Sequence, residues 1–384
     1  MALPGSGAIS LSAIQAEFGG TNPISMSEYY GAGGVPSSGT LRLSDFYGVA
    51  AAEFKTVLYA GNSSTQTITG FGFDPDIVIF KRRGGTGSNY VIDSVRGNYK
   101  GLYTDGLQAA ENTNSSAYPA LVSGGFYLPG SSLTFNTTGN NYVAWGWKLG
   151  GSPVNNSDGT LSSVVLANTN LGFSIVSYVG AGNFGDTVGH GLGSVPEIVI
   201  TKSRNSGGNW VAVLTGTSNL SGLVGTTETL ASGEYAYGYL NANNAITTSG
   251  FNFYSSNSST FFTFIQRTLG ESYISYCFTS VAGASKIGAY TGNGNSTTGV
   301  TVTTGFEPSF LLIKRANSTS DWLVLDNVRD TSNPRSVALF LDLNIAEINS
   351  STYNVDFNSN GFTAKGTSGN INANGSSYLY IAFA

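Results

Sequence analysis

Few residues in this chain could carry out catalysis. The one histidine, His190, lies between two glycines, and no nucleophile motif of a Ser/His/Asp hydrolase accompanies it, so we interpret it as a turn residue. Paired carboxylates can cleave glycans, and the candidate pairs are Asp74 with Asp76 and Asp326 with Asp330. Both pairs lie in turn-like sequence or beside basic residues. We therefore expect no catalytic residues and a protein that is not an enzyme.

Metal and cofactor sites are not expected either. One histidine and one cysteine, Cys277, are too few for a site built from those ligands, and one cysteine forms no disulfide within the chain. Cys277 lies in the apolar sequence Tyr273-Ile-Ser-Tyr-Cys-Phe278, so we expect a buried, inert thiol. Gly84-Gly-Thr-Gly87 lacks the Gly-Lys-Ser/Thr ending of a phosphate-binding loop and is interpreted as a turn.

The best candidate for direct contact with a ligand is a tyrosine stripe, Tyr235, Tyr237 and Tyr239. Strict alternation places the three rings on one face of a strand, where they suit sugar stacking or a protein interface. Packing of this stripe within its own domain or against a neighbouring subunit remains the alternative.

Two Asp-x-x-Arg pairs could also contact a ligand. They are Asp93 with Arg96 and Asp326 with Arg329. We interpret them as surface ion pairs that close hairpin ends and contribute well under about 1 kcal/mol.

Charge and hydropathy exclude other partners. The net charge is −5 and the longest basic run is Lys81-Arg82-Arg83, so a nucleic-acid partner is not expected. No run of about 18 apolar residues occurs, so membrane insertion is not expected. The first residues have neither a basic region nor an apolar stretch, which predicts synthesis in the cytoplasm without a signal peptide.

The composition predicts an all-β protein. Gly contributes 52 residues, aromatic residues 12% and charged residues only 10%, with Asn, Ser, Thr and Gly between short apolar runs. This profile is typical of short strands joined by tight turns, because these residues satisfy the backbone conformations and hydrogen bonds of turns.

Five landmarks recur three times in the same order. Each set has a Tyr-x-Gly opening, a proline followed by an apolar run, an aromatic run, a Gly-Phe pair and a closing aromatic run. A lysine stands six positions after each proline, at Lys81, Lys202 and Lys314, which we place at strand edges. The Gly-Phe pairs are Gly125-Phe126, Gly250-Phe251 and Gly361-Phe362. The closing runs begin at Tyr142, Tyr273 and Tyr378.

This repetition predicts three tandem β-sandwich repeats, of jelly-roll or lectin-like type. Their bounds are 54–151, 172–283 and 285–384. About 100 residues is the size of a self-contained sandwich, so we expect consecutive copies to follow one another like beads.

Residues 1–50 predict an extended arm with short helical turns. Three short apolar alternations each lead through a serine to an aromatic residue and a glycine, and Ser12-Ala-Ile-Gln15 resembles a capping box. Such pieces are too short for a core of their own, so we expect the arm to order against another protein. The predicted attachment residues are Ile9, Leu11, Phe18, Ile24, Met26, Tyr29, Tyr30, Leu43, Phe46 and Tyr47.

The arm resembles the N-terminal segment of tail proteins of tailed phages, particularly marine ones. The similar stretches are Glu17-Phe-Gly-Gly-Thr-Asn-Pro-Ile-Ser25 and Leu43-Ser-Asp-Phe-Tyr-Gly48. The remaining chain resembles the tail-fibre-like domains of the same phages. The similar stretches there are Asp93-Ser-Val-Arg-Gly97, Tyr142-Val-Ala-Trp-Gly-Trp-Lys148, Asn156-Ser-Asp-Gly-Thr160, Gly172-Phe-Ser-Ile-Val-Ser-Tyr178 and Val188-Gly-His-Gly-Leu192.

The resemblance implies a virion tail fibre or appendage protein. Residues 1–50 would bind other phage tail proteins, and the β-domains would recognise a glycan or protein on the host surface. The resemblance also implies a homo-oligomer, expected to be a trimer. The alternative is a purely structural virion protein, such as a collar, baseplate or capsid decoration, and a more remote one is a polysaccharide depolymerase.

Overall fold

The structure is a computed structural model of the chain. It describes residue 3 and residues 7–18, 20, 22–23, 25–29, 39–46, 53–105, 112–130, 134–183, 185–207, 210–214, 235–239, 246–251 and 268–384. The chain divides into two compact units, Met1–Glu53 and Phe54–Ala384, called here the arm and the body. Each unit is described by itself.

The described residues of the arm form three short helical elements. They are α1 (Leu11–Phe18), η1 (Met26–Tyr29) and η2 (Leu43–Phe46). These elements pack an apolar cluster of Leu3, Ile9, Ile14, Tyr29 and Phe46. The prediction that this segment is extended and lacks a core of its own is therefore wrong. Each short element contributes a fully buried side chain, and the rings of Tyr29 and Phe46 meet edge to face at 6.0 Å.

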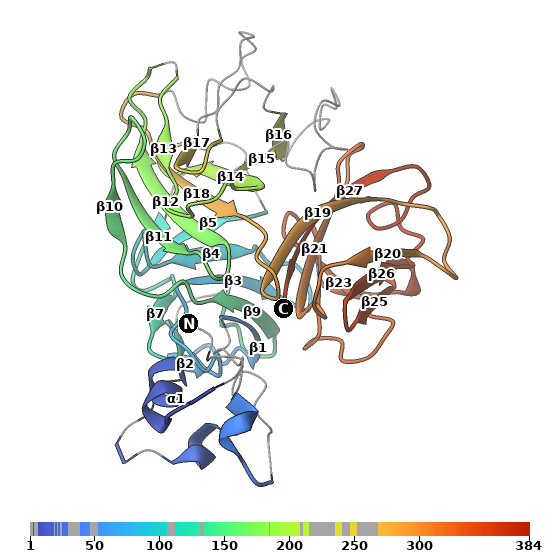
Figure 1. The fold of residues 1–384 in the computed structure, drawn as a ribbon. Helices are drawn as coiled ribbons and strands as arrows, with labels where there is room; N and C mark the ends of the chain where they lie inside the picture. The colour runs from blue at the N-terminus through green and yellow to red at the C-terminus, as the bar shows by residue number, and fades with distance from the viewer. Residues whose placement is uncertain are drawn as a thin grey trace. The chain divides into compact units, whose positions relative to one another are not determined.

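The described residues of the body form three large sheets and three small ones, so the predicted all-β fold is confirmed (Figure 1). The first large sheet has the order β1 (Phe54–Ala60), β9 (Asn141–Trp147), β3 (Ile77–Arg82), β4 (Tyr90–Asp93), β5 (Lys100–Tyr103) and β6 (Asn112–Thr113). The second has the order β10 (Val154–Asn156), β11 (Ser163–Asn168), β12 (Phe173–Val179), β18 (Ser272–Phe278), β14 (Ile198–Ser203), β15 (Trp210–Leu214) and β16 (Tyr235–Tyr239). The third has the order β19 (Ser285–Thr291), β27 (Ser377–Phe383), β21 (Phe310–Arg315), β22 (Leu323–Asp326), β23 (Val337–Phe340) and β24 (Ile348–Asn349).

A small sheet accompanies each large one. The small sheets are β2 (Gln66–Thr69) with β8 (Gly125–Leu128) and β7 (Ala120–Val122), then β13 (Val188–Gly189) with β17 (Gly250–Phe251), and finally β20 (Val300–Thr303) with β26 (Gly361–Ala364) and β25 (Val355–Asn358). A short turn, η4 (Ser351–Tyr353), precedes β25. Each large sheet and its small partner enclose an apolar core, so each pair is sandwich-like.

The three large sheets share a run of four antiparallel strands. These runs are β1-β9-β3-β4, β12-β18-β14-β15 and β19-β27-β21-β22. The second sheet differs because β10 and β11 extend it beyond β12, and because β16 pairs with β15 in parallel. We call residues 54–151, 172–283 and 285–384 the first, second and third segments.

A fourth apolar cluster joins the segments. It contains Trp147 from the first, Phe278 from the second and Phe383 from the third, with many neighbours. The expectation of separate domains like beads is therefore not met, since 54–384 is one compact unit. The closing strands β9, β18 and β27 are buried on both faces after their first residue, which is the property of a strand between two cores.

Tyrosine pairs fix the register of each opening strand on its closing strand. Tyr59 lies opposite Tyr142, Tyr178 opposite Tyr273, and Tyr290 opposite Tyr378. The rings stack at 5.1, 5.3 and 4.9 Å between centroids. A slip of one residue would move every side chain of the strand to the other face of the sheet. By fixing the register, the stacked tyrosines keep each side chain facing the correct core, either that of its own sandwich or the one shared by the segments.

The Gly-Phe landmarks lie in the small sheets. Phe126, Phe251 and Phe362 are fully buried, and the glycine before each allows a neighbouring strand to approach. A Cβ on Gly125 would lie 1.8 Å from the carbonyl oxygen of Ile68, so no other residue fits there without moving the strand.

Candidate functional site

The structure places the predicted attachment residues in different environments. Ile9, Tyr29 and Phe46 are buried in the arm's core, and Phe18 and Met26 pack against it. Ile24, Tyr30 and Tyr47 lie outside the described residues. Leu11 and Leu43 are exposed, with 39% and 42% of their surface accessible. Most of the described attachment residues therefore build the arm, and two leucines are available to a partner.

Both exposed leucines are the first residues of their helical elements. Ser10 caps α1, because its Oγ accepts a hydrogen bond from the N–H of Ala13 at 3.1 Å, so the capping residue is Ser10 and not Ser12 as predicted. In η2 the Asp45 carboxylate accepts from the N–H of Arg42 at 2.7 Å. Glu28 makes the same bond to the N–H of Ser25 at 2.9 Å before η1. These hydrogen bonds fix the start of α1 and of η2, and therefore the positions of Leu11 and Leu43.

The tyrosine stripe occupies β16 at one edge of the second large sheet. Its partner there is β15, with Trp210 opposite Tyr235 and Leu214 opposite Tyr239. The side chains of Tyr235, Tyr237 and Tyr239 lie outside the described part of the structure, so their role as a contact surface remains a prediction.

The two Asp-x-x-Arg pairs lie inside the body, which corrects the prediction of surface ion pairs. The side chains of Asp93, Arg96, Asp326 and Arg329 have no accessible surface. Each arginine donates from Nε to its aspartate at 2.6 Å and from its backbone N–H at 2.8 or 2.9 Å. Removal of one partner would leave a buried charge unpaired, which lowers the free energy of unfolding by about 3–5 kcal/mol.

Each pair also receives a hydrogen bond from another segment. The hydroxyl of Tyr276 donates to Asp93 Oδ2 at 2.8 Å, which links the second segment to the first. The indole N–H of Trp145 donates to Asp326 Oδ2 at 3.1 Å, which links the first segment to the third. Trp145 and Tyr276 occupy equivalent positions, because each lies two residues before the last residue of its strand, β9 or β18.

At the third junction the two equivalent positions are apolar. The position equivalent to Asp93 and Asp326 in the second segment is Leu214, because each lies opposite the first residue of the proline strand. The position equivalent to Trp145 and Tyr276 on β27 is Ile381. Leu214 and Ile381 both belong to the shared apolar cluster. At these positions two junctions therefore pair a donor with a carboxylate, and the third pairs two apolar side chains.

The three lysines after the prolines are buried, so their predicted place at strand edges is wrong. Lys81, Lys202 and Lys314 are each no more than 3% exposed and lie on the inner strands β3, β14 and β21. Burial lowers the pKa of Lys81 and of Lys202 to about 8, and it lowers that of Lys314. Their Nζ groups meet polar atoms: that of Lys314 donates to the carbonyl of Ser320.

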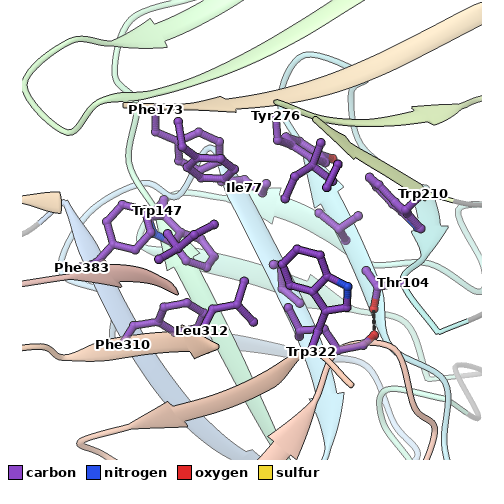
Figure 2. A pocket seen from close by; sticks show the side chains of 17 residues that line it. Ile77, Thr104, Trp147, Phe173, Trp210, Tyr276, Phe310, Leu312, Trp322 and Phe383 are labelled. Carbon is purple, nitrogen blue, oxygen red and sulfur yellow. Dashed lines mark hydrogen bonds between the residues drawn. The ribbon is translucent and has the colours of Figure 1, made fainter. Parts of the chain in front are cut away.

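An apolar cavity of about 110 Å³ lies among the three segments (Figure 2). Trp147, Phe278 and Phe383, which end the three closing strands, line it together with Trp210 and Trp322. The hydroxyl of Thr104, also in the lining, donates to the carbonyl of Leu341 at 2.6 Å (Figure 2). A cavity of this kind takes up small apolar molecules in preference to water.

One family model matches residues 50–384, and its description is "Domain of unknown function (DUF7483)". The chain belongs to the DUF7483 family. No curated protein and no solved structure matches it. The DUF7483 match runs through all three segments, as the body does, and most of the arm lies outside it.

Within the DUF7483 region the candidate catalytic residues are held by structural bonds. His190 is buried, accepts the N–H of Leu192 on Nδ1 at 3.1 Å and so donates from Nε2 to Thr247 O at 3.0 Å. Burial lowers its pKa. Cys277 is fully buried, as predicted, and burial raises the pKa of its thiol.

The carboxylates considered for glycan cleavage also act as acceptors within the DUF7483 region. Asp76 accepts the backbone N–H groups of Leu149 and Gly150, both at 2.8 Å. Asp74 accepts the N–H of Gly124 at 2.7 Å, and Asp330 that of Ser336 at 2.7 Å. Asp74 and Asp76 thus join backbone segments that are distant in sequence, and Asp330 closes a local loop.

Two negative findings concern only the described residues. None of their histidine, cysteine, aspartate and glutamate side chains form a group of three that could hold a metal ion. No helix among them is long and apolar enough to cross a membrane.

Proposed function

We propose that the chain is a non-enzymatic tail fibre or appendage protein of a phage virion. The arm attaches it to other tail proteins, and the body recognises a glycan or protein on the host surface. The observation that carries this proposal is the division of the chain into a small unit with its own core and a large all-β body. A unit that folds separately can serve as an attachment point while the body faces outward.

The exposed leucines support the attachment role of the arm. Leu11 and Leu43 project from the first turns of α1 and η2, beside capped helix starts. An exposed apolar side chain fixed on a capped turn loses little conformational freedom when a partner covers it, which favours binding.

The body supports recognition over catalysis. Its buried carboxylates bind arginines, backbone N–H groups and aromatic donors, so they stabilise the fold. Recognition would then use outward loops and the sheet edge at β16, where the tyrosine alternation suits contact with a sugar or a protein.

The decisive experiment compares the full chain with residues 54–384 alone. Both are added to host cells and, separately, to virions that lack this protein. We expect the body to bind cells but not virions, and the full chain to bind both. If neither protein binds cells, the adhesion proposal is wrong and a purely structural role in the virion takes its place. Release of sugar from host polysaccharide would instead indicate a depolymerase.

Point variants test directly whether the arm binds the virion through its exposed leucines. A Leu11→Ser and Leu43→Ser double variant removes two exposed side chains and leaves the arm's core intact, so virion binding is expected to fall at least tenfold with cell binding unchanged. The control is Ser27→Ala, an exposed position on η1, which should change neither. Equal binding by the double variant and the parent would exclude the leucines as the contact.

The oligomeric state remains part of the proposal. A trimer is expected from the resemblance, but the large sheets of one chain already bury their inner faces against one another. We therefore propose that the arm, and not the shared core of the body, carries any self-association. Sedimentation of the full chain and of 54–384 tests this, and a trimer of the isolated body would contradict it.

A further inference from the structure

A lysine and an asparagine face each other inside the first segment. Phe80 on β3 pairs with Tyr90 on β4, so the next pair along this hairpin is Lys81 with Asn89. Lys81 Nζ donates to Asn89 Oδ1 at 2.7 Å. Both side chains are buried, with 1% and 0% of their surface accessible. An amine and a carboxamide are thus held together away from water.

The amide of Asn89 is held in one orientation. Its Nδ2 lies within hydrogen-bonding distance of the carbonyl oxygens of Phe340, Leu341 and Leu343, at 3.2, 3.0 and 3.0 Å. Lys81 Nζ also donates to the carbonyl of Leu343, at 2.6 Å. These contacts from the third segment point Oδ1 toward the amine and keep the carbonyl carbon beside it.

A buried carboxyl group completes the cluster. The pKa of Asp105 is raised by burial, against the opposing influence of the Asn89 backbone N–H and the Lys81 amine. Its Oδ2 is buried and has no hydrogen-bond partner in the described part of the chain. Burial lowers the pKa of Lys81 to about 8, so a neutral amine is accessible near neutral pH. A neutral amine and a protonated carboxyl are the forms needed for acyl transfer.

We propose that Lys81 and Asn89 join in an intramolecular isopeptide bond, with Asp105 as the group that moves the proton. The neutral Nζ adds to Cγ of Asn89 and a C–N bond forms. A proton passes from Nζ through the Asp105 carboxyl to Nδ2, the Cγ–Nδ2 bond breaks, and ammonia leaves. Nothing is oxidised or reduced. The new secondary amide keeps one N–H, which can retain the bond to Leu343.

In the described residues of the other two segments, no asparagine lies opposite the lysine. The position opposite Lys202 is Trp210 and that opposite Lys314 is Trp322, one residue before the paired Val211 and Leu323. The side chain of tryptophan has no carbonyl group for an amine to attack. The proposal therefore predicts one cross-link, in the first segment, and supplies two lysines of matched burial as internal controls.

The first test is the mass of the intact, purified full chain. We expect it to be lower than the sequence mass by one molecule of ammonia. Cyclisation at an Asn-Gly sequence such as Asn374-Gly375 releases ammonia too, so peptide mapping must locate the loss. With the cross-link, trypsin no longer cleaves after Lys81, and residues 56–82 remain joined to residues 84–96. Full cleavage after Lys81 in the folded chain would overturn the proposal.

Variants separate the chemistry from folding. Lys81→Met and Asn89→Ala should each restore the sequence mass, whereas Lys202→Met and Lys314→Met should retain the deficit and the branched peptide. Asp105→Asn should leave Lys81 and Asn89 unjoined in a folded body, as judged by circular dichroism, and Asp105→Glu should recover part of the cross-link. An unchanged cross-link in a folded Asp105→Asn protein would remove Asp105 from the mechanism.

Mass is a better readout than thermal stability here. The bond would close a loop between residues only eight apart, so it removes little conformational entropy from the unfolded chain. A small difference in Tm between Asp105→Asn and the parent is therefore compatible with full cross-linking of the parent.

Discussion

The indole N–H of Trp145 donates to the carboxylate of Asp326 at 3.1 Å, although 181 residues separate them along the chain. This bond, with that of Tyr276 to Asp93, fastens one sheet to the next through a buried ion pair. Such bonds contribute specificity to a core that is otherwise apolar, because only one docking of the sheets satisfies them.

Trp145→Phe tests the Trp145–Asp326 bond, with a control on the same strand. Removing the donor should lower the free energy of unfolding by about 1–3 kcal/mol beyond the effect of lost volume, because Asp326 stays buried with one bond fewer. Trp147→Phe is the control, since Trp147 Nε1 is buried without a hydrogen-bond partner in the described residues. Urea unfolding measures both. Equal losses would mean that the hydrogen bond contributes nothing.

Leu214→Asp tests the apolar junction. The variant places a carboxylate where the other segments have Asp93 and Asp326, but Thr217 stands where they have Arg96 and Arg329. An unpaired buried charge should destabilise the body by about 3–5 kcal/mol at neutral pH, and less at pH 4, where the carboxyl is protonated. Leu214→Met is the apolar control. A stable variant whose unfolding does not change with pH would show that water reaches this junction.

The lowered pKa of Lys202 predicts that the free energy of unfolding of the body rises with pH. Its pKa falls from the usual 10.5 to about 8 on folding, so its contribution is present above pH 10.5 and is lost as the pH falls through 8. The difference is about 3 kcal/mol at most. Lys202→Met should reduce the pH dependence of unfolding between pH 8 and 10.5 by the share that comes from Lys202. An unchanged profile in the variant would exclude Lys202 as its source.

Filling the cavity should stabilise the body. Ala212 lines it, and the equivalent residues in the other segments are Val91 and Val324. Ala212→Val adds two methyl carbons to empty space, so the free energy of unfolding should rise by about 1 kcal/mol. Ala144→Val, in the core of the first sandwich, is the control and should be destabilising, since Ala144 is fully buried and does not line this cavity. Thermal unfolding compares the two.

Gly125→Ala should damage the first small sheet. The added Cβ would lie 1.8 Å from the carbonyl oxygen of Ile68, so β2 must move and we expect a loss of about 3 kcal/mol or more. Gly124→Ala is the neighbouring control: its φ is +72° and no atom lies within 4 Å of the new Cβ, so only about 1–2 kcal/mol of backbone strain is added. Similar losses for both would place the constraint in the turn and not in the strand contact.

The sequence predicted the strands better than it predicted their surroundings. The proline runs, the closing aromatic runs and the Gly-Phe pairs all lie in strands, because alternation and turn residues are local signals. Lys81 and the Asp-x-x-Arg pairs were placed at the surface because charged residues are seldom buried. Their partners, such as Leu343, Trp145 and Tyr276, are distant in sequence, so local patterns could not reveal them.

One local signal could have indicated the shared core, although separate domains were expected. Tyr142-Val-Ala-Trp-Gly-Trp147 has no polar residue at any alternate position, whereas a strand with one face in solvent alternates. Such a run predicts burial on both faces and therefore a second layer beyond the sandwich. The arm's core had a weaker signal, because its aromatic residues stand in short elements that suggest docking as readily as self-packing.

The shared core has a consequence for how such a chain can vary during evolution. Domains joined like beads can be gained or lost one at a time, and the rest of the chain still folds. Here the loss of any segment would expose the apolar residues that the other two contribute to the shared cluster. A substitution at one residue of the shared core, such as Leu214, therefore acts on a cluster that also contains residues of the other segments, such as Ile381.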